Sequence, residues 1–363
     1  MHKERFVVLN PLETTTIGSF PKPNFVPVRD WFDLARQKGA MDTVETTLQY
    51  NLDIQKNKDT HEPLFLQATK EILDIQLHAG VSIPTDGEVR RENYIHYHCR
   101  HLAGFDFRKL EHRVLRDGAY ETDLPAIRGE IKHSGKNYSA HDYLASQALS
   151  SRQIKFTLPG PLTIMDTTAD CFYDDRLKLN TALAESINKE VLALVEAGCR
   201  YIQVDEPLFA RSVKDALDFG MEGLERCFHG VPKSVSRIVH MCCGYPEHLD
   251  DHDYKKADPL SYHQLSKAID EAAFDQISIE DKHCCNDLSL LEKFQYKTVI
   301  FGSIAIASSH LETVDEVVDR LKAAIEHIDR NRLVVAPDCG LGLLSSKLAE
   351  EKLRVMCKAA TLV

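Results

Sequence analysis

Short apolar segments alternate with amphipathic segments along most of this chain. Four segments carry apolar residues at helical spacing, and the first two of them stop before Gly80 and Gly198, as helices commonly do. They span residues 64–79, 181–197, 313–328 and 348–360. Eight segments rich in β-branched or apolar residues predict buried parallel strands. They span residues 14–20, 81–88, 154–160, 201–206, 237–243, 276–280, 298–304 and 333–340.

The alternation of eight strands with helices predicts one α/β domain, a (β/α)8 TIM barrel over residues 1–363. A doubly wound open sheet is the alternative. The chain has no G-x-G-x-x-G after its first strand and no G-x-x-x-x-G-K-[ST] anywhere, which disfavours a nucleotide-binding open sheet. Residues 93–151 fit the repeat poorly. We interpret them as an excursion over the C-terminal face of the barrel, with a small β-hairpin, that shapes access of substrate.

The composition excludes several classes of protein. With 43% hydrophobic and 27% charged residues, the chain has an ordinary globular composition. A net charge of −11 makes non-specific binding to nucleic acid or to a membrane surface unfavourable. No apolar run is long enough to span a membrane, and the first residues lack the apolar core of a secretion signal, so we expect a cytoplasmic protein. Its ten cysteines then predict thiols or metal ligands, not disulfides.

The ends of three predicted strands carry residues that bind metals. His240 and Cys242 are two positions apart in one strand, so their side chains point to the same side. Glu280 closes the sixth strand and Cys339 the eighth, and the C-terminal ends of barrel strands meet at one face. Imidazole, thiolate and carboxylate ligands suit Zn²⁺. The sequence therefore predicts a zinc site there. The nearby loop residues His283, Cys284 and Cys285 are alternative ligands.

Further charged and aromatic residues follow the same strand ends. Asp205 and Glu206 close the fourth strand, where each can orient a substrate, handle a proton, or form a salt bridge or helix cap. Glu88, close to Asp86, has the same alternatives. Arg90 and Arg91 can bind an anionic group of a substrate, or can balance the acidic residues around them. At the start of the excursion, three residues are candidates for the mouth of the site: Tyr94, His96 and His98.

Taken in order, seven motifs resemble one family. They are TTTIGSFPKP, PTDGEVRRENY, FTLPGP, YIQVDEP, HMCCGYP, QISIE and VVAPDCGLG, between about residues 14 and 360. With them the chain resembles the cobalamin-independent methionine synthase superfamily, specifically its C-terminal catalytic barrel and its short single-barrel relatives. Those relatives include the epoxyalkane:coenzyme M transferase, also called 2-hydroxypropyl-CoM lyase.

The resemblance implies a set of site residues. It implies that His240, Cys242, Glu280 and Cys339 hold the zinc ion. It also implies contacts with a thiol substrate from Ile17 and Ser19, from Glu88 and from Asp205. In the synthase, the equivalents of Glu88 and Asp205 bind the amino group of homocysteine.

Two features depart from the full synthase. The synthase has an additional N-terminal barrel that helps to hold its folate, and this sequence contains none. The synthase also has a histidine five residues after the glycine of its seventh strand. Counting from Gly302 leads here to Ala307, and His310 is out of register. The amino-acid sequences of several motifs are closer to those of the coenzyme M transferase branch. The identity of the methyl donor is therefore left undecided.

We therefore predict a zinc-dependent thiol alkyltransferase. Its partners would be a small thiol acceptor and an alkyl donor. The leading hypothesis is methyl transfer to homocysteine or a related thiol in methionine biosynthesis, from a folate, a corrinoid protein or a small methyl compound. The thiol would bind zinc as a thiolate, and we expect Glu280 to be the ligand that it displaces.

Other hypotheses stay open. The main alternative is addition of a thiol to an epoxide. More remote are a metal-free barrel related to uroporphyrinogen decarboxylase and a zinc-binding scaffold without activity. A homodimer is compatible with the sequence.

Overall fold

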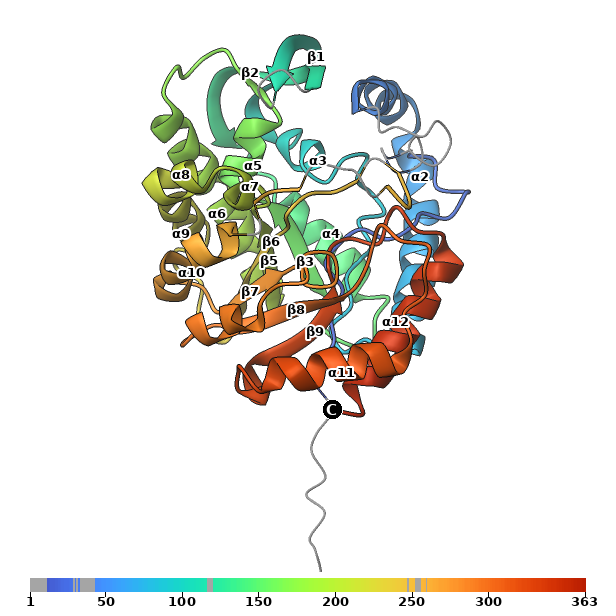
Figure 1. The fold of residues 1–363 in the computed structure, drawn as a ribbon. Helices are drawn as coiled ribbons and strands as arrows, with labels where there is room; N and C mark the ends of the chain where they lie inside the picture. Colours follow the sequence, from blue (N-terminus) through green and yellow to red (C-terminus); the bar gives the residue numbers. More distant parts are fainter. Residues whose placement is uncertain are drawn as a thin grey trace, which may run out of the picture.

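A computed structural model describes residues 12–28, 30, 32, 43–115, 120–246, 248–251, 256–258 and 260–363. Its centre is a parallel sheet of six strands in the order β3-β5-β6-β7-β8-β9 (Figure 1). The strands are β3 (Lys155–Pro159), β5 (Tyr201–Asp205), β6 (Ser236–Met241), β7 (Gln276–Ile279), β8 (Thr298–Ile304) and β9 (Leu333–Pro337). Six of the eight predicted strands are thus confirmed as parallel strands, and the four predicted metal ligands and Asp205 lie at or just beyond their carboxyl ends.

The prediction that residues 14–20 and 81–88 form regular strands is wrong. They form only isolated parallel bridges, which pair Thr14 with Val335, Thr15 with Ile83, and Thr85 with Lys155. Part of the reason is chemical. Pro84 interrupts the second segment and has no backbone N–H for a ladder. Through these bridges the two segments lie between β9 and β3, the two outer strands of the sheet.

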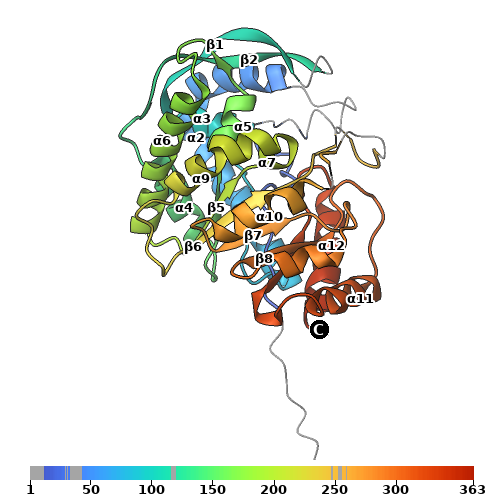
Figure 2. The same cartoon turned by 60° about the vertical axis from the view of Figure 1, so that its left-hand side comes forward.

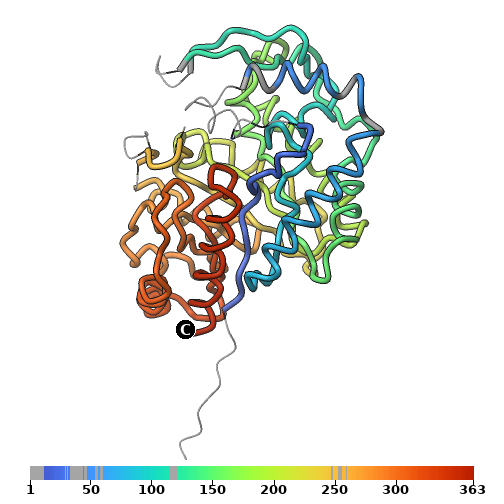
Figure 3. Tube along the Cα trace, turned by 90° about the vertical axis from the view of Figure 1, so that its right-hand side faces the viewer, coloured from blue at the N-terminus to red at the C-terminus, as the bar shows by residue number. Residues whose placement is uncertain are grey.

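Helices surround the strands in both cartoon views (Figures 1 and 2). The longer ones are α2 (Thr43–Ala79), α4 (Tyr138–Gln147), α6 (Arg176–Glu196), α9 (Met221–Cys227), α10 (Ser261–Glu271), α11 (Val314–Ile325) and α12 (Ser346–Ala360). All four predicted helices are present. Gly80 and Gly198 have φ values of 102° and 91°, as expected just after a helix. Leu12 donates its N–H to the carbonyl of Ala360 (3.1 Å), and Figure 3 shows the N-terminal segment running beside α12.

The excursion at residues 93–151 contains a long antiparallel hairpin. The hairpin is formed by β1 (Leu102–Leu115) and β2 (Tyr120–His133). The helix α3 (His96–Cys99) precedes it, and α4 follows it. The predicted hairpin is therefore present but larger than expected. β2 also pairs in parallel with the short strand β4 (Ala169–Asp170). In Figure 2 the hairpin lies across the top of the molecule.

Short helical turns complete the fold. They are α5 (Pro161–Asp166), α7 (Leu208–Arg211), α8 (Val213–Asp215), a π-helical turn (Ala216–Gly220) and two 3₁₀ turns (Leu288–Lys293 and Arg330–Arg332). None of the helices in the described part of the chain has the length and apolar character needed to cross a membrane. All ten cysteines are free thiols, as predicted.

Candidate metal centre

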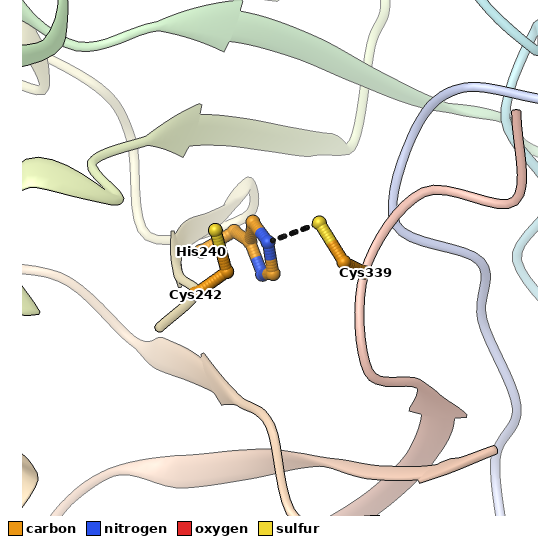
Figure 4. A group of neighbouring side chains, drawn as sticks. All are labelled: His240, Cys242 and Cys339. Carbon is orange, nitrogen blue, oxygen red and sulfur yellow. Dashed lines mark hydrogen bonds between the residues drawn. The ribbon is translucent and has the colours of Figure 1, made fainter. Parts of the chain in front are cut away.

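Three of the four predicted metal ligands come together at the carboxyl ends of β6 and β9. His240 lies near the end of β6, Cys242 follows that strand, and Cys339 follows β9. One ligand atom from each of the three lies within 4.8 Å of the others, and Nε2 of His240 is 3.4 Å from Sγ of Cys339 (Figure 4). His240 and Cys242 are buried and Cys339 is half-buried. We call these three residues the trio.

A serine on the neighbouring strand fixes the histidine ring. Ser278 pairs with His240 in the register between β6 and β7, and its hydroxyl is 3.0 Å from Nδ1 of His240. This contact leaves Nε2 to face Cys339. Sequence reasoning missed Ser278. The available signal was its position two residues before Glu280, on the same side of a predicted strand.

The spacing of the trio fits a zinc ion. With Zn–S about 2.3 Å and Zn–N about 2.0–2.1 Å, tetrahedral coordination places a sulfur and a nitrogen ligand about 3.6 Å apart. The 3.4 Å between His240 and Cys339 is close to that separation. Three protein ligands with one free position are the arrangement of catalytic zinc sites, which leave room for a substrate.

The two thiols of the trio shift each other's pKa in opposite directions. A hydrogen bond with Cys339 lowers the pKa of Cys242 well below its usual range, although burial opposes the shift, and His240 lowers it further. The same hydrogen bond raises the pKa of Cys339. One thiolate is therefore already favoured, which suits a cationic ligand.

Glu280, the fourth predicted ligand, is not part of the trio, and its carboxylate contacts Cys243 and Cys284. Its Oε1 accepts a hydrogen bond from the N–H of Cys243 (3.1 Å), and its Oε2 is 3.6 Å from Sγ of Cys284. Burial raises the pKa of Glu280 well above its ordinary value, and the charge of Cys242 adds to this. A role for Glu280 as a ligand of the trio's metal stays a prediction.

The trio opens into a cavity of about 220 Å³. The predicted thiol-substrate residues line the same cavity: Ile17, Ser19, Glu88, Tyr94 and Asp205. The excursion contributes Thr122 and Leu124 of β2, together with His96. These residues of the excursion therefore lie at the wall of the cavity, and the role of the excursion in substrate access stays a prediction.

Glu88 is held in a strained backbone conformation inside this cavity. Its φ is +58°, a region that non-glycine residues rarely adopt and that is enriched at functional sites. Its Oε1 accepts hydrogen bonds from the hydroxyl of Thr157 (2.9 Å) and from Arg91 (3.1 Å). Burial raises the pKa of Glu88, and the charge of Arg91 opposes that shift. The chain thus fixes one carboxylate oxygen of Glu88 through Thr157 and Arg91.

Asp205, at the end of β5, is the second acidic group of the cavity. The amide of Gln203 donates hydrogen bonds to Oδ1 of Asp205 (2.7 Å) and to the carbonyl of Ile17 (3.0 Å). Burial raises the pKa of Asp205 to about 7, although His240 lowers it. Sequence reasoning missed Gln203, which stands two residues before Asp205 and so lies on the same side of the strand.

The two predicted arginines lie among internal carboxylates. Arg90 forms a bidentate ion pair with Glu62 (2.5 and 2.6 Å), and Arg91 contacts Glu88 and Thr157. Neither is among the residues that line the cavity. Of their two proposed roles, these contacts match the balancing of acidic neighbours.

The side chain of Glu206 also has hydrogen-bond partners inside the protein. Its carboxylate accepts hydrogen bonds from the N–H groups of Leu162 (2.9 Å) and Thr163 (3.0 Å) at the start of α5. This is the helix-cap alternative of the sequence analysis.

Comparison with known proteins gives a consistent family. The family described as "Cobalamin-independent synthase, Catalytic domain" matches residues 12–362. A methionine synthase of Sulfolobus acidocaldarius is 27% identical over 354 residues, which cover 97% of this chain and 92% of that protein. A methionine synthase of Saccharolobus solfataricus is 28% identical and covers 97% of this chain and 95% of that protein.

Solved structures agree with the sequence relatives. A B12-independent methionine synthase from a Shewanella species, solved in complex with selenomethionine, superimposes with a TM-score of 0.79 at 28% identity and covers 97% of both chains. A second one, from Listeria monocytogenes and titled a putative enzyme of this kind, is 18% identical with a TM-score of 0.65 and supports the fold alone. Since the family match extends over nearly all of the sequence, this chain belongs to the family of cobalamin-independent synthases and corresponds to their catalytic domain.

Proposed function

We propose that this protein is a zinc-dependent methyltransferase that methylates the thiol of homocysteine to form methionine. The single observation that carries the proposal is the trio of His240, Cys242 and Cys339 at the wall of a cavity. Two acidic residues, Glu88 and Asp205, line the same cavity. The relatives named methionine synthase favour a methyl group over an epoxide as the electrophile.

The trio would hold the zinc ion, with Ser278 orienting His240. A zinc ion bound there would lower the pKa of a coordinated thiol and so supply a thiolate nucleophile at neutral pH. Glu280 would be the additional ligand that an incoming thiol replaces. In the structure its carboxylate already has an alternative partner in the N–H of Cys243.

Glu88 and Asp205 would bind the amino group of the substrate. Burial raises the pKa of both carboxyl groups, and Glu88 raises that of Asp205 further. A cationic ammonium group between them would favour their ionised forms, since opposite charges stabilise each other most strongly where water is excluded. Ile17 and Ser19 would contact the rest of the substrate, and Tyr94 would close the cavity beside them.

We further propose that the sheet is a closed (β/α)8 barrel forming one catalytic domain. The bridges of residues 14–15 and 83–85 support this, because they connect β9 to β3 through the two N-terminal segments. Backbone hydrogen bonds follow the same path, from Thr15 to Val335 (2.9 Å), from Ile83 to Thr14 (3.0 Å) and from Lys155 to Pro84 (2.8 Å). Closure would bring all strand ends to one face, which is where barrel enzymes place their sites.

The test is formation of methionine by zinc-loaded protein. The protein is incubated with homocysteine and, in separate reactions, methyltetrahydrofolate, a methylated corrinoid protein or a small methyl compound, with an epoxide as a parallel reaction. Methionine is measured by mass spectrometry. We expect methionine from at least one methyl donor, loss of both zinc and turnover in Cys339→Ser, and no change in Cys171→Ser, which replaces an exposed thiol. Zinc-loaded protein that makes no methionine from any donor contradicts the proposal.

A further inference from the structure

A fully buried lysine lies on the face of the sheet that carries the substrate-binding residues. Lys155, the first residue of β3, is 0% exposed. In the parallel register between β3 and β5, Lys155 pairs with Tyr201 and Thr157 pairs with Gln203. Residues two positions apart in a strand share one face of the sheet. Because the hydroxyl of Thr157 donates to Glu88 on that face, the side chain of Lys155 lies on it too.

Two buried polar atoms on this face lack a hydrogen-bond partner within the described part of the chain. They are Nζ of Lys155 and Oε1 of Gln203. Burial lowers the pKa of Lys155 to about 7, and the charge of Asp205 opposes this shift. Whether charged or neutral, the amine has a proton to donate, and an amide oxygen can only accept one. The two atoms are therefore complementary, and each is costly to leave unsatisfied.

The orientation of the Gln203 amide is determined by its other contacts. Its NH2 group donates to Oδ1 of Asp205 (2.7 Å) and to the carbonyl of Ile17 (3.0 Å). A carboxylate and a carbonyl accept hydrogen bonds, so the amide must present its nitrogen to them and its oxygen elsewhere. Lys155 and Gln203 are diagonal neighbours on paired strands, and long side chains can reach across such a diagonal.

We propose that Lys155 is a positioning residue for the substrate. It donates to Oε1 of Gln203 through one enclosed water molecule, and so keeps the amide turned towards Asp205 and Ile17. Enclosed waters commonly satisfy buried polar groups in this way. The inference rests on the proposed function, in which Asp205 binds the amino group of homocysteine.

Loss of Lys155 should act on the substrate through Gln203. Of the described residues, those that line the cavity include Asp205 and Ile17 but not Lys155. Without a donor for Oε1, the amide could turn and place its oxygen against the carboxylate of Asp205, where the two would repel each other. The amino group of the substrate would then meet a displaced Asp205, whereas the trio would be unchanged.

Thiol binding to cobalt-loaded protein tests the inference, because a sulfur ligand changes the absorption of Co²⁺. Homocysteine is compared with 4-mercaptobutyrate, which lacks only the amino group. We expect Lys155→Met to bind homocysteine about 10-fold more weakly, as for the loss of one buried hydrogen-bond partner, and to bind 4-mercaptobutyrate nearly as the wild type does. Lys155→Gln keeps a donor on a shorter side chain. It should show a smaller loss of the same kind, and it decides the case if Lys155→Met does not fold.

Lys297→Met is the matched control. It also removes a buried lysine, one whose Nζ donates to the carbonyls of Asp270 (2.8 Å) and Ala272 (2.9 Å). These contacts lie at the end of α10, and Lys297 is not among the residues that line the cavity. Lys297→Met should therefore bind both thiols as the wild type does.

A double-mutant cycle shows whether Lys155 acts through Gln203. In a Gln203→Met background, Lys155→Met should have no further effect on homocysteine binding. An equal loss for both thiols, no loss for either, or an undiminished effect in the Gln203→Met background would overturn the inference.

Failure of the proposed function has a different signature. A cobalt-loaded wild type whose absorption does not respond to homocysteine would contradict the proposed function. Urea unfolding of the metal-free variants would still decide on the contact between Lys155 and Gln203. We expect the losses of stability in Lys155→Met and Gln203→Met to be non-additive in the double variant, and additive losses would overturn the contact.

Discussion

Replacing Ser278 by alanine should weaken metal binding without removing any ligand. Ser278 is 1% exposed, and its hydroxyl lies 3.0 Å from Nδ1 of His240. This contact fixes the ring so that Nε2 faces Cys339 at 3.4 Å. In the Ser278→Ala variant the ring loses this contact, and a buried nitrogen is left without its partner.

The size of the effect follows from what such outer contacts contribute. Removing a partner that orients a metal-binding histidine typically weakens metal affinity about 10–100-fold. At about 1.4 kcal/mol for each factor of ten, this corresponds to about 1.4–2.8 kcal/mol. The loss should be similar for Zn²⁺ and Co²⁺, because the contact acts on the ligand and not on the ion.

Competition with a chromophoric chelator measures this affinity directly. Ser303→Ala is the matched control, since it removes another buried hydroxyl, one that contacts the carbonyl of Ala336 (3.3 Å) and not His240. Thermal unfolding of the metal-free variants checks that both are folded. If Ser278→Ala binds zinc as tightly as Ser303→Ala, the orienting role of Ser278 is wrong.

Two further predictions concern stability. Burial lowers the pKa of His96 from 6.5 to about 4, so the folded state keeps this ring neutral. Its contribution is complete above pH 6.5 and is lost as the pH falls towards 4, by at most about 3 kcal/mol. His96→Gln should therefore flatten the loss of stability between these pH values in urea unfolding, and His229→Gln at an exposed position should not. Lys352 forms a fully buried ion pair with Glu312 (2.7 Å). Lys352→Met should cost about 3–5 kcal/mol, and adding Glu312→Leu should recover much of this in a double-mutant cycle; equal losses in the single and double variants would contradict the argument.

The sequence was sufficient to predict a helix or strand where one local pattern determined that element. The helix at 313–328 is an example, because Thr313 and Glu316 form a reciprocal capping box at its start. The six strands of the central parallel sheet follow from their apolar runs in the same way. The segments at residues 14–20 and 81–88 differed from the predicted strands. Threonine hydroxyls there take the place of some backbone hydrogen bonds, and Pro84 has no N–H to donate. Thr15, for example, bonds the carbonyl of Ile83 through its side chain (2.7 Å).

The sequence could predict those residues of the candidate site that lie at the carboxyl ends of the strands. Two-residue alternation placed His240 and Cys242 together, and the convergence of strand ends added Cys339. Contacts between different strands, such as that of Ser278, depend on register, which a single sequence does not fix. The orientation of Glu280 depends on side-chain rotation about a correctly placed backbone. No spacing rule could predict it.

The vicinal pair Cys242-Cys243 divides its two thiols between the trio and the surroundings of Glu280. Consecutive residues of an extended segment point in opposite directions, so one thiol joins the trio and the other faces Glu280 and Cys284. If Glu280 turns to bind the trio's metal, the buried N–H of Cys243 loses its acceptor, which costs about 1–3 kcal/mol. A substrate thiol that replaces Glu280 would restore that hydrogen bond. If the proposed zinc site is correct, the backbone at Cys243 would therefore lower the cost of releasing Glu280, which is the property that a centre accepting an external sulfur requires.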